Sequence, residues 1–221
     1  MVERTIETRR GGAEKARKER KIAESSRGAP GKRPRSLARL HRYRRNECKH
    51  GSRRRTLIHM AAGRQPKLLD AGARVPDVRL KLLSGGDISL GEIAARGPAL
   101  LAFFKISCPV CQMTFPFLER LSEAGILPVY GISQNDARDT RDFNEDFGVT
   151  FPTLLDDEDD NFRASNAFGI SSVPTMFLVE TDGTISRVIQ GWLRKEMEWL
   201  GARGGAVVIR QGDNVPEWKA G

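Results

Sequence analysis

The sequence predicts an α/β fold in which helices cover a mixed β-sheet. The run Ala99–Phe104 is wholly apolar, which is typical of a parallel strand buried on both faces. Apolar strands and polar, capped helices alternate through the middle of the chain, as in proteins that build a parallel sheet. Near the end, the turn Asp182-Gly183 joins two consecutive strands, and this hairpin adds antiparallel pairing. The expected architecture is therefore an α/β sandwich around a mixed sheet.

The folded part opens with a β-hairpin. Residues 78–82 alternate apolar and polar side chains, residues 84–87 supply a turn, and residues 88–90 can return as a short strand. Ser89 and Glu92 have the spacing of a capping box. A short helix is therefore predicted directly after the hairpin.

The remaining elements follow from the same signals of period, capping and turns. In chain order, the expected elements are a helix over 109–124, a strand over 127–132, a helix over 136–147 capped by Asp136, a strand over 151–155, a helix that the acidic run 156–160 caps and that ends at Phe168, strands over 175–180 and 185–190, and a closing helix over 192–200.

Charge divides the chain into two parts. Residues 1–59 contain 20 Lys and Arg against 6 Glu, whereas residues 60–221 contain 17 against 22 Asp and Glu. All three histidines also precede residue 60, at positions 41, 50 and 59. The second part therefore has no imidazole for a catalytic triad, a general base or a zinc site.

The basic part, residues 1–64, is expected to be a disordered tail, because it has too few large apolar side chains to form a core. Three interpretations stay open: a start codon assigned too far upstream, with Met60 as the true start, an inert tail, or an arm that binds nucleic acid or an anionic membrane surface. Cys48 among these arginines is interpreted as incidental. Residues 65–203 are expected to be one domain, and residues 204–221 an extended tail.

Location is inferred only from missing signals. The chain has no apolar run of 18 residues that would cross a membrane. It also has no apolar stretch typical of a secretory signal. The sequence therefore predicts a cytoplasmic protein without a transmembrane segment.

Cys108 and Cys111 carry the predicted chemistry. They are the only cysteines after residue 60, and they stand between a buried strand and a helix that begins at Pro109. Free N–H groups and the dipole of a helix N-terminus stabilise a thiolate. Cys108 would therefore attack a disulfide, and the more buried Cys111 would resolve the mixed disulfide. A zinc site would need four ligands, so no metal is expected, although inert cysteines remain an alternative.

The segment "FFKISCPVCQMTFPFLERL", followed by "FGISSVPTMFLVETDGTI", resembles the thioredoxin-like superfamily over about residues 68–195. It is most similar to the redoxin branch, which includes the alkyl hydroperoxide reductase/thiol-specific antioxidant proteins and TlpA-like oxidoreductases. The resemblance implies a three-layer sandwich with an N-terminal hairpin addition. It also implies that Pro116 kinks the first long helix. Pro174 would be cis and face the cysteines, with the backbone at Val173 left to bind a substrate chain.

Several positions depart from the family pattern. Ser107 replaces the tryptophan that commonly precedes the first cysteine, and Ala102 replaces a buried aspartate that is thought to accept the proton of Cys111. Thr114 stands where some TlpA-like proteins carry glutamate. The proton acceptor is therefore unassigned, with a water beside Thr114 or Lys105 as one option. Lys105 could also lower the pKa of a thiolate or simply be solvated.

Two activities compete, with a redox-inert scaffold as a third reading. The first is a thiol–disulfide oxidoreductase that acts on a disulfide-containing protein or a small thiol. The second is a peroxiredoxin-like peroxidase, for which the resemblance implies Pro and Thr where this chain has Leu101 and Lys105. These two departures favour the oxidoreductase. No nucleotide fingerprint is present, so no cofactor is expected and electrons would come from a partner such as a thioredoxin system.

Overall fold

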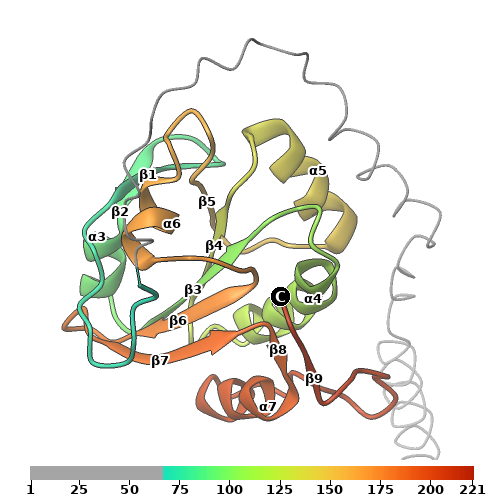
Figure 1. Ribbon diagram of the computed structural model, residues 1–221. Helices are drawn as coiled ribbons and strands as arrows, with labels where there is room; N and C mark the ends of the chain where they lie inside the picture. Colours follow the sequence, from blue (N-terminus) through green and yellow to red (C-terminus); the bar gives the residue numbers. More distant parts are fainter. Residues whose placement is uncertain (1–66) are drawn as a thin grey trace, which may run out of the picture. The chain divides into compact units, whose positions relative to one another are not determined.

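The computed structural model describes residues 67–221. Residues 1–66 lie outside this part, and with them Cys48, Met60 and the whole of the predicted tail, residues 1–64. The described residues form one large sheet whose strand order is β2-β1-β5-β4-β3-β6-β7 (Figure 1). Its strands are β1 (Arg79–Leu82), β2 (Asp87–Ser89), β3 (Ala99–Phe104), β4 (Val129–Ser133), β5 (Thr153–Leu155), β6 (Thr175–Val179) and β7 (Ile185–Gln190). The helices are α3 (Leu90–Ala95), α4 (Pro109–Glu123), α5 (Ala137–Phe147), α6 (Arg163–Phe168) and α7 (Arg194–Arg203).

The sheet is mixed, as the sequence predicts. Strand β3 lies inside the sheet between two neighbours, and it pairs parallel with β4 and antiparallel with β6. All six residues of β3 are buried, because helices cover both faces of the sheet. An apolar run without alternation is the expected pattern for such a strand.

Two hydrophobic cores lie on opposite faces of the sheet. One includes Phe104 of β3 and Phe115 of α4, whose ring centroids are 4.3 Å apart. The other includes Phe103 and Phe168 of α6, with centroids 5.0 Å apart. Because neighbouring side chains of a strand point to opposite faces, β3 anchors both cores. Three layers result, and this confirms the predicted sandwich.

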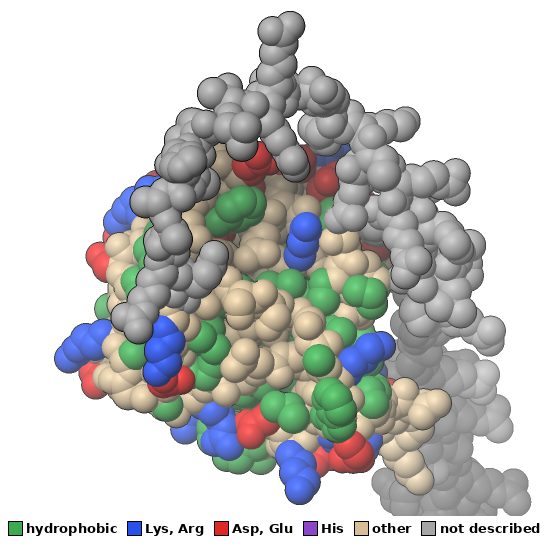
Figure 2. All heavy atoms as spheres, viewed as in Figure 1, with side chains coloured by type: hydrophobic (Ala, Val, Ile, Leu, Met, Phe, Trp, Pro, Cys, Tyr) green, Lys and Arg blue, Asp and Glu red, His purple; other side chains and the backbone are tan. Residues whose placement is uncertain are grey.

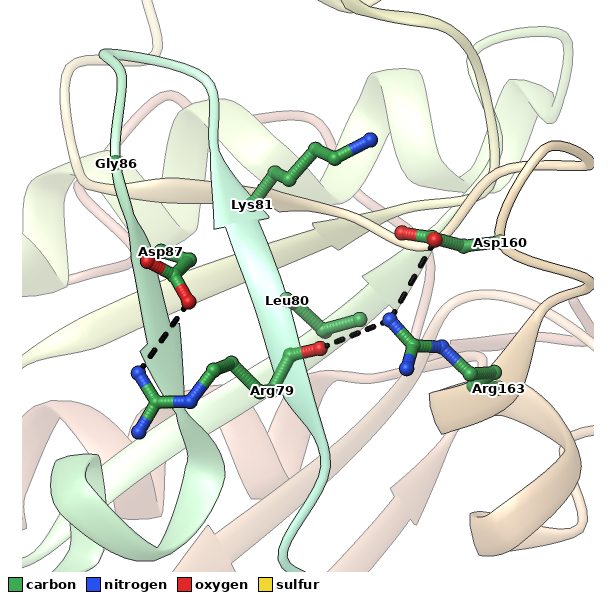
Figure 3. Close-up of a pocket in the computed structure, with 7 residues that line it drawn as sticks. All are labelled: Arg79, Leu80, Lys81, Gly86, Asp87, Asp160 and Arg163. Atoms are coloured by element: carbon green, nitrogen blue, oxygen red, sulfur yellow. Dashed lines mark hydrogen bonds and ion pairs between the residues drawn. The ribbon is translucent and has the colours of Figure 1, made fainter.

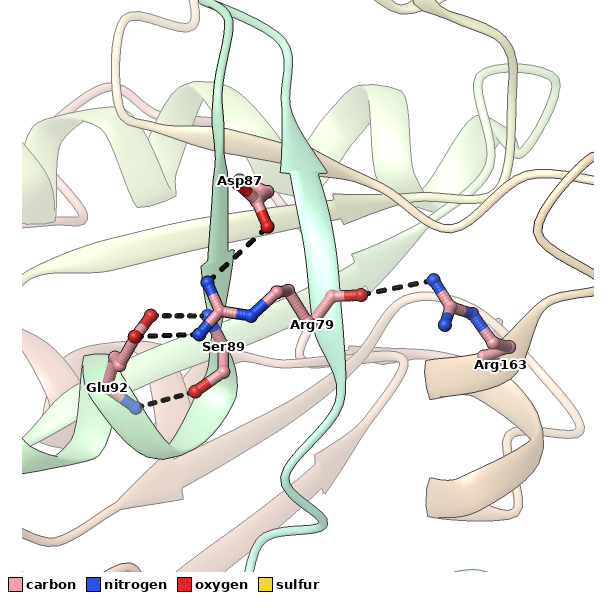
Figure 4. A network of polar contacts seen from close by, with 5 residues as sticks. All are labelled: Arg79, Asp87, Ser89, Glu92 and Arg163. Atoms are coloured by element: carbon pink, nitrogen blue, oxygen red, sulfur yellow. Dashed lines mark hydrogen bonds and ion pairs between the residues drawn. The ribbon is translucent and has the colours of Figure 1, made fainter.

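The N-terminal hairpin and its capping box are also confirmed. Strand β1 pairs antiparallel with β2. The Ser89 hydroxyl accepts the main-chain N–H of Glu92, and the Glu92 carboxylate accepts that of Ser89, at 3.1 and 2.8 Å. Arg79 extends this network to Glu92 and Asp87 (Figure 4). The cap fixes the point at which the hairpin turns into α3.

The outer edge of β7 is partly covered by the segment that precedes β1. The N–H of Gly72 donates to the carbonyl of Ile185, and the N–H of Ile185 donates to that of Ala73, both at 2.8 Å. The N–H of Val75 donates to Gly183 in the preceding turn. Residues 72–75 therefore take up hydrogen-bonding groups where β7 begins.

The C-terminal part differs from the predicted helix over 192–200. The helix begins only at Arg194, and Trp192 lies in the short strand β8 (Trp192–Leu193), which pairs with β9 (Trp218–Lys219). Residues 204–221, expected as an extended tail, have little regular structure beyond β9 and lie against the domain. Trp192 is fully buried, and its indole Nε1 donates to the carbonyl of Pro216 at 2.7 Å. Because Pro216 lies 24 positions later in the chain, the local sequence pattern around Trp192 could not predict this arrangement.

No helix among residues 67–221 is long and apolar enough to cross a bilayer.

Candidate active site

Cys108 lies at the N-terminus of α4, immediately beyond the loop that follows β3. It is the N-cap residue, with extended backbone angles, and Pro109 follows as the first helical residue. The main-chain N–H of Cys111 donates to the Cys108 sulfur, with a nitrogen–sulfur distance of 3.4 Å. An N-cap side chain normally supplies an oxygen for such an unpaired N–H. Here a sulfur takes that position, which is the arrangement that the sequence predicts.

The two cysteines differ in exposure. Cys108 is half-buried, whereas Cys111 is fully buried in the core on the α4 side of the sheet, and both are free thiols. An incoming molecule can therefore reach Cys108 before Cys111. The burial supports the predicted order of an outer attacking thiol and an inner resolving thiol.

The pKa values of the two thiols also differ, and the more exposed thiol is the more acidic. The pKa of Cys108 is lowered to about 6, first by the hydrogen bond from the Cys111 side chain, and then by main-chain N–H groups of Cys111 and Val110. The positive charge of Lys219 adds to this effect. Burial raises the pKa of Cys111 well above its usual range. At neutral pH the site therefore holds a thiolate at Cys108 and a thiol at Cys111.

Val173 faces Cys108 across the sheet edge. Residues Phe103 and Thr175 pair in the β3–β6 ladder, so the loop before β6 lies beside the loop after β3. When protonated, the Cys108 sulfur donates to the Val173 carbonyl at 3.2 Å. The Val173–Pro174 peptide bond is cis, as the resemblance implies.

The predicted supporting residues have different environments. Thr114 is fully buried, and its hydroxyl donates to the Val110 carbonyl at 2.7 Å. That proton is already used within the helix, so Thr114 can offer only oxygen lone pairs to the Cys111 proton. The Lys105 side chain is exposed, and its carbonyl accepts the N–H of Cys108 at 3.1 Å. Pro116 lies within α4.

Two residues that the sequence analysis missed hold the loop before Cys108. The Gln112 amide donates to the Ile106 carbonyl at 2.7 Å, and the Asn135 amide oxygen accepts the Ile106 N–H at 3.0 Å. Asn135 follows β4, the parallel neighbour of β3. The carboxyl ends of parallel strands meet at one edge of a sheet, and this rule could have located Asn135. Gln112 had no such signal.

The C-terminal residues also lie at the site, which the sequence did not predict. A Cβ atom added to Gly221 would lie 2.3 Å from the Val173 carbonyl oxygen. Lys219 is close enough to lower the pKa of Cys108. The last residues of the chain therefore form one side of the active site.

A hollow of about 420 Å³ lies elsewhere, over the N-terminal hairpin and the start of α6 (Figure 3). Neither cysteine lines it. Arg163 spans one side of it, because its guanidinium donates to the Arg79 carbonyl at 3.2 Å and pairs with Asp160 at 3.4 Å. Within residues 67–221, no three acidic, Cys or His side chains are grouped to hold a metal ion.

The chain matches known proteins over this domain. The model of the AhpC/TSA family matches residues 71–188. The thiol-disulfide oxidoreductase ResA of Geobacillus thermodenitrificans is 28% identical over 130 residues, which cover 57% of this chain and 72% of that protein. ResA of Bacillus subtilis is 23% identical over 134 residues, covering 58% and 72%.

Solved structures agree in fold. A thiol:disulfide interchange protein from a Bacteroides species superposes with a TM-score of 0.54 at 20% identity, over 66% of this chain and 96% of that one. The thioredoxin domain of a thiol-disulfide oxidoreductase from Bacteroides vulgatus gives 0.52 at 22% identity, over 56% and 91%. At such identity the likeness shows the fold, which is thioredoxin-like.

The comparisons overturn one expectation. The sequence predicts a cytoplasmic protein, but the ResA relatives are membrane-anchored or extracytoplasmic thiol-disulfide oxidoreductases. The expectation rested on missing signals, and such an absence does not assign a compartment. The prediction of a cytoplasmic protein is therefore wrong.

Proposed function

Because the chain belongs to the AhpC/TSA family, whose model matches residues 71–188, we propose that it is a thiol–disulfide oxidoreductase that uses Cys108 and Cys111 as its redox pair. The observation that carries this proposal is the Cys108 sulfur in the N-cap position of α4, with a pKa of about 6 and a fully buried thiol one turn away. The names of the ResA relatives support the same reaction class.

In the reducing direction, the Cys108 thiolate attacks one sulfur of a substrate disulfide. A bond forms between Cys108 and that sulfur, and the second substrate sulfur leaves as a thiolate that takes a proton from solvent. Cys111 then gives up its proton, which solvent or the departing substrate sulfur takes up, and attacks the Cys108 sulfur. The Cys108–Cys111 disulfide forms, and the first substrate sulfur leaves as a thiolate. Two electrons pass from the cysteine pair to the substrate, and a partner dithiol restores them.

The surroundings of the pair assist each step. Gln112 and Asn135 fix the loop that leads to Cys108, which keeps the sulfur at the helix terminus. The buried position of Cys111 raises its pKa, so it stays protonated until the mixed disulfide brings its target close. Lys105, Thr114, Pro109 and Pro116 act through the shape of the loop and helix. Val173 and Pro174 border the sulfur where the substrate enters.

The domain that performs this reaction extends over residues 65–203 in the proposal, with residues 204–221 as an appended segment. The partners are a disulfide-bearing substrate and an electron donor such as a thioredoxin system. Neither partner requires a bound cofactor in this chain.

The test is a stopped-flow comparison, because oxidation of the pair should alter the fluorescence of Trp192. The reduced full chain is mixed with a protein disulfide and, separately, with hydrogen peroxide. Fast oxidation by the disulfide and slow oxidation by peroxide support the proposal, and Cys108→Ser should abolish the fast reaction. Rapid peroxide consumption that requires Cys108 would instead identify a peroxidase, despite Leu101 and Lys105 at the two departing positions.

A further inference from the structure

Side-chain and main-chain contacts hold the C-terminal residues against the domain up to Glu217. Arg120 of α4 donates to the Val208 carbonyl at 2.9 Å and pairs with Asp213 at 2.5 Å. Further along, the Trp192 indole donates to the Pro216 carbonyl, and the Arg194 N–H donates to the Glu217 carbonyl at 2.8 Å. These contacts set the direction in which the chain continues.

The next residues run alongside the loop that borders Cys108. Lys219 pairs with Trp192 in the β8–β9 ladder. A Cβ atom added to Gly191 would lie 2.4 Å from the Lys219 carbonyl oxygen, and one added to Gly221 would lie 2.3 Å from that of Val173. Approaches this close are possible only for glycine. The backbone of residues 219–221 therefore packs directly against the backbone of Gly191 and of Val173.

This position is next to the reactive sulfur. The Val173 carbonyl that Gly221 approaches is also the acceptor for the Cys108 thiol. Residues that pair directly in a ladder project to the same face, so Lys219 projects with Trp192, whose ring packs against Phe117 of α4 at 4.9 Å. The backbone of Lys219–Gly221 thus borders the Val173 loop beside Cys108, and the charge of Lys219 is near enough to lower the pKa of Cys108.

A polypeptide disulfide and a small disulfide would interact differently with the segment Lys219–Gly221. An extended polypeptide binds an enzyme largely through main-chain hydrogen bonds to an exposed edge, and the main chain at Val173 is already covered by Gly221. A small disulfide needs only the half-buried sulfur itself. Leu193 and Trp218, which are 38% and 68% exposed, pair on the outer face of β8 and β9, where hydrophobic side chains gather (Figure 2).

We propose that the segment Lys219–Gly221 determines substrate specificity by occupying the main-chain site beside Cys108, so that small disulfides react directly and extended polypeptide disulfides react only after displacing it. This inference rests on the proposed oxidoreductase function. All four residues from Trp218 to Gly221 are exposed. Displacing Lys219–Gly221 would break the pairing of Lys219 with Trp192, while the contacts up to Glu217 could stay in place.

The test uses two shortened chains and two substrates. One variant ends after Trp218 and lacks the whole segment, while the other ends after Lys219 and keeps the positive charge. Each is reduced and mixed with oxidised glutathione or with an unstructured peptide of about ten residues dimerised through one disulfide. The readout is the ratio of the peptide rate to the glutathione rate. Any change in the pKa of Cys108 after loss of Lys219 affects both rates and cancels in this ratio.

We expect the ratio to rise about tenfold or more in both shortened chains, equivalent to about 1.4 kcal/mol of barrier. Val207→Ser is the matched control, because Val207 is 74% exposed in the same C-terminal part and should leave the ratio unchanged. An unchanged ratio in the shortened chains, or a lower one that marks the segment as a docking site for peptides, overturns the inference. The proposed function fails separately, if Cys108→Ser in the full chain leaves both rates intact.

Discussion

The sulfur of Cys108 and the carbonyl oxygen of Val173 lie 3.2 Å apart, although 65 positions separate the two residues. A carbonyl oxygen can accept only from the protonated thiol. The N–H of Cys111, at 3.4 Å on the helix side, can in turn stabilise the thiolate. Loss of the proton therefore removes the bond to the Val173 carbonyl and leaves the Cys111 N–H as a donor to the sulfur. The site is organised for both protonation states of its nucleophile.

The first prediction concerns the resolving thiol. Cys111→Ser removes the second attack but leaves the N-cap sulfur of Cys108, so the reaction should stop at the mixed disulfide. Mass spectrometry after mixing with oxidised glutathione should find one glutathione per chain at Cys108. The wild-type chain should instead lose two hydrogens and retain no adduct. A Cys111→Ser chain that forms no adduct would count against the proposed roles.

The second prediction concerns pH. With a pKa of about 6, Cys108 is about nine-tenths thiolate at pH 7, against a few hundredths for a free cysteine. Its alkylation rate should therefore rise as the pH passes through 6 and level off before pH 8. Cys111 should remain unmodified over this range, because burial raises its pKa. Peptide mapping after timed exposure to iodoacetamide measures both residues.

A matched pair of variants tests the cause of that shift. The side chain of Cys111 is the largest contribution to the low pKa of Cys108. Cys111→Ala should therefore move the midpoint of Cys108 alkylation upward, whereas Cys111→Ser retains a hydroxyl donor and should move it less. If both variants keep the alkylation midpoint of the wild-type chain, the main-chain N–H groups are the main cause of the low pKa instead.

The third prediction separates the members of the acidic run 156–160. Asp156 is fully buried and accepts the N–H groups of Ala164 and Ser165 at 2.8 and 2.7 Å. Asp156→Ala leaves both donors without this acceptor and should lower the free energy of unfolding by about 2–4 kcal/mol. Asp159 is exposed, so Asp159→Ala should change it by less than about 0.5 kcal/mol. Urea unfolding followed by circular dichroism compares the two.

The fourth prediction concerns the anchor of the C-terminal part. Trp192→Phe keeps a ring near Phe117 but removes the donor to Pro216 and leaves space in the core. The free energy of unfolding should fall by about 1–3 kcal/mol. Trp199→Phe is the control, since Trp199 is only half-buried and stacks under Arg187 at 4.0 Å. A larger loss in the control would contradict the anchoring role of Trp192.

Much of the fold could be read from the sequence because its signals are local. The apolar run of β3, the Ser89–Glu92 capping box and the Asp136 cap of α5 each specify an element within a few residues. The helix N-terminus at Cys108 follows from the same kind of signal. The predicted position of this cysteine is confirmed for that reason.

The remainder depended on partners distant in the chain. Strand β8 has two residues and exists only because β9 lies beside it, so periodicity assigned Trp192 to the following helix. Residues 219–221 reach the site through contacts with Gly191 and Val173, and nothing in their composition signals this. The acidic run shows the same limit: only its first residue, Asp156, is buried against α6.

The segment 72–75 has a consequence for how molecules of this protein meet. A free edge strand exposes unpaired N–H and C=O groups that can recruit a strand from another chain. Those groups at the beginning of β7 are occupied by Gly72 and Ala73. Farther along, Arg187 places a charged side chain on the same strand, held by Glu196 at 2.6 Å. Edge-to-edge pairing with a strand of another molecule is thereby disfavoured where β7 begins.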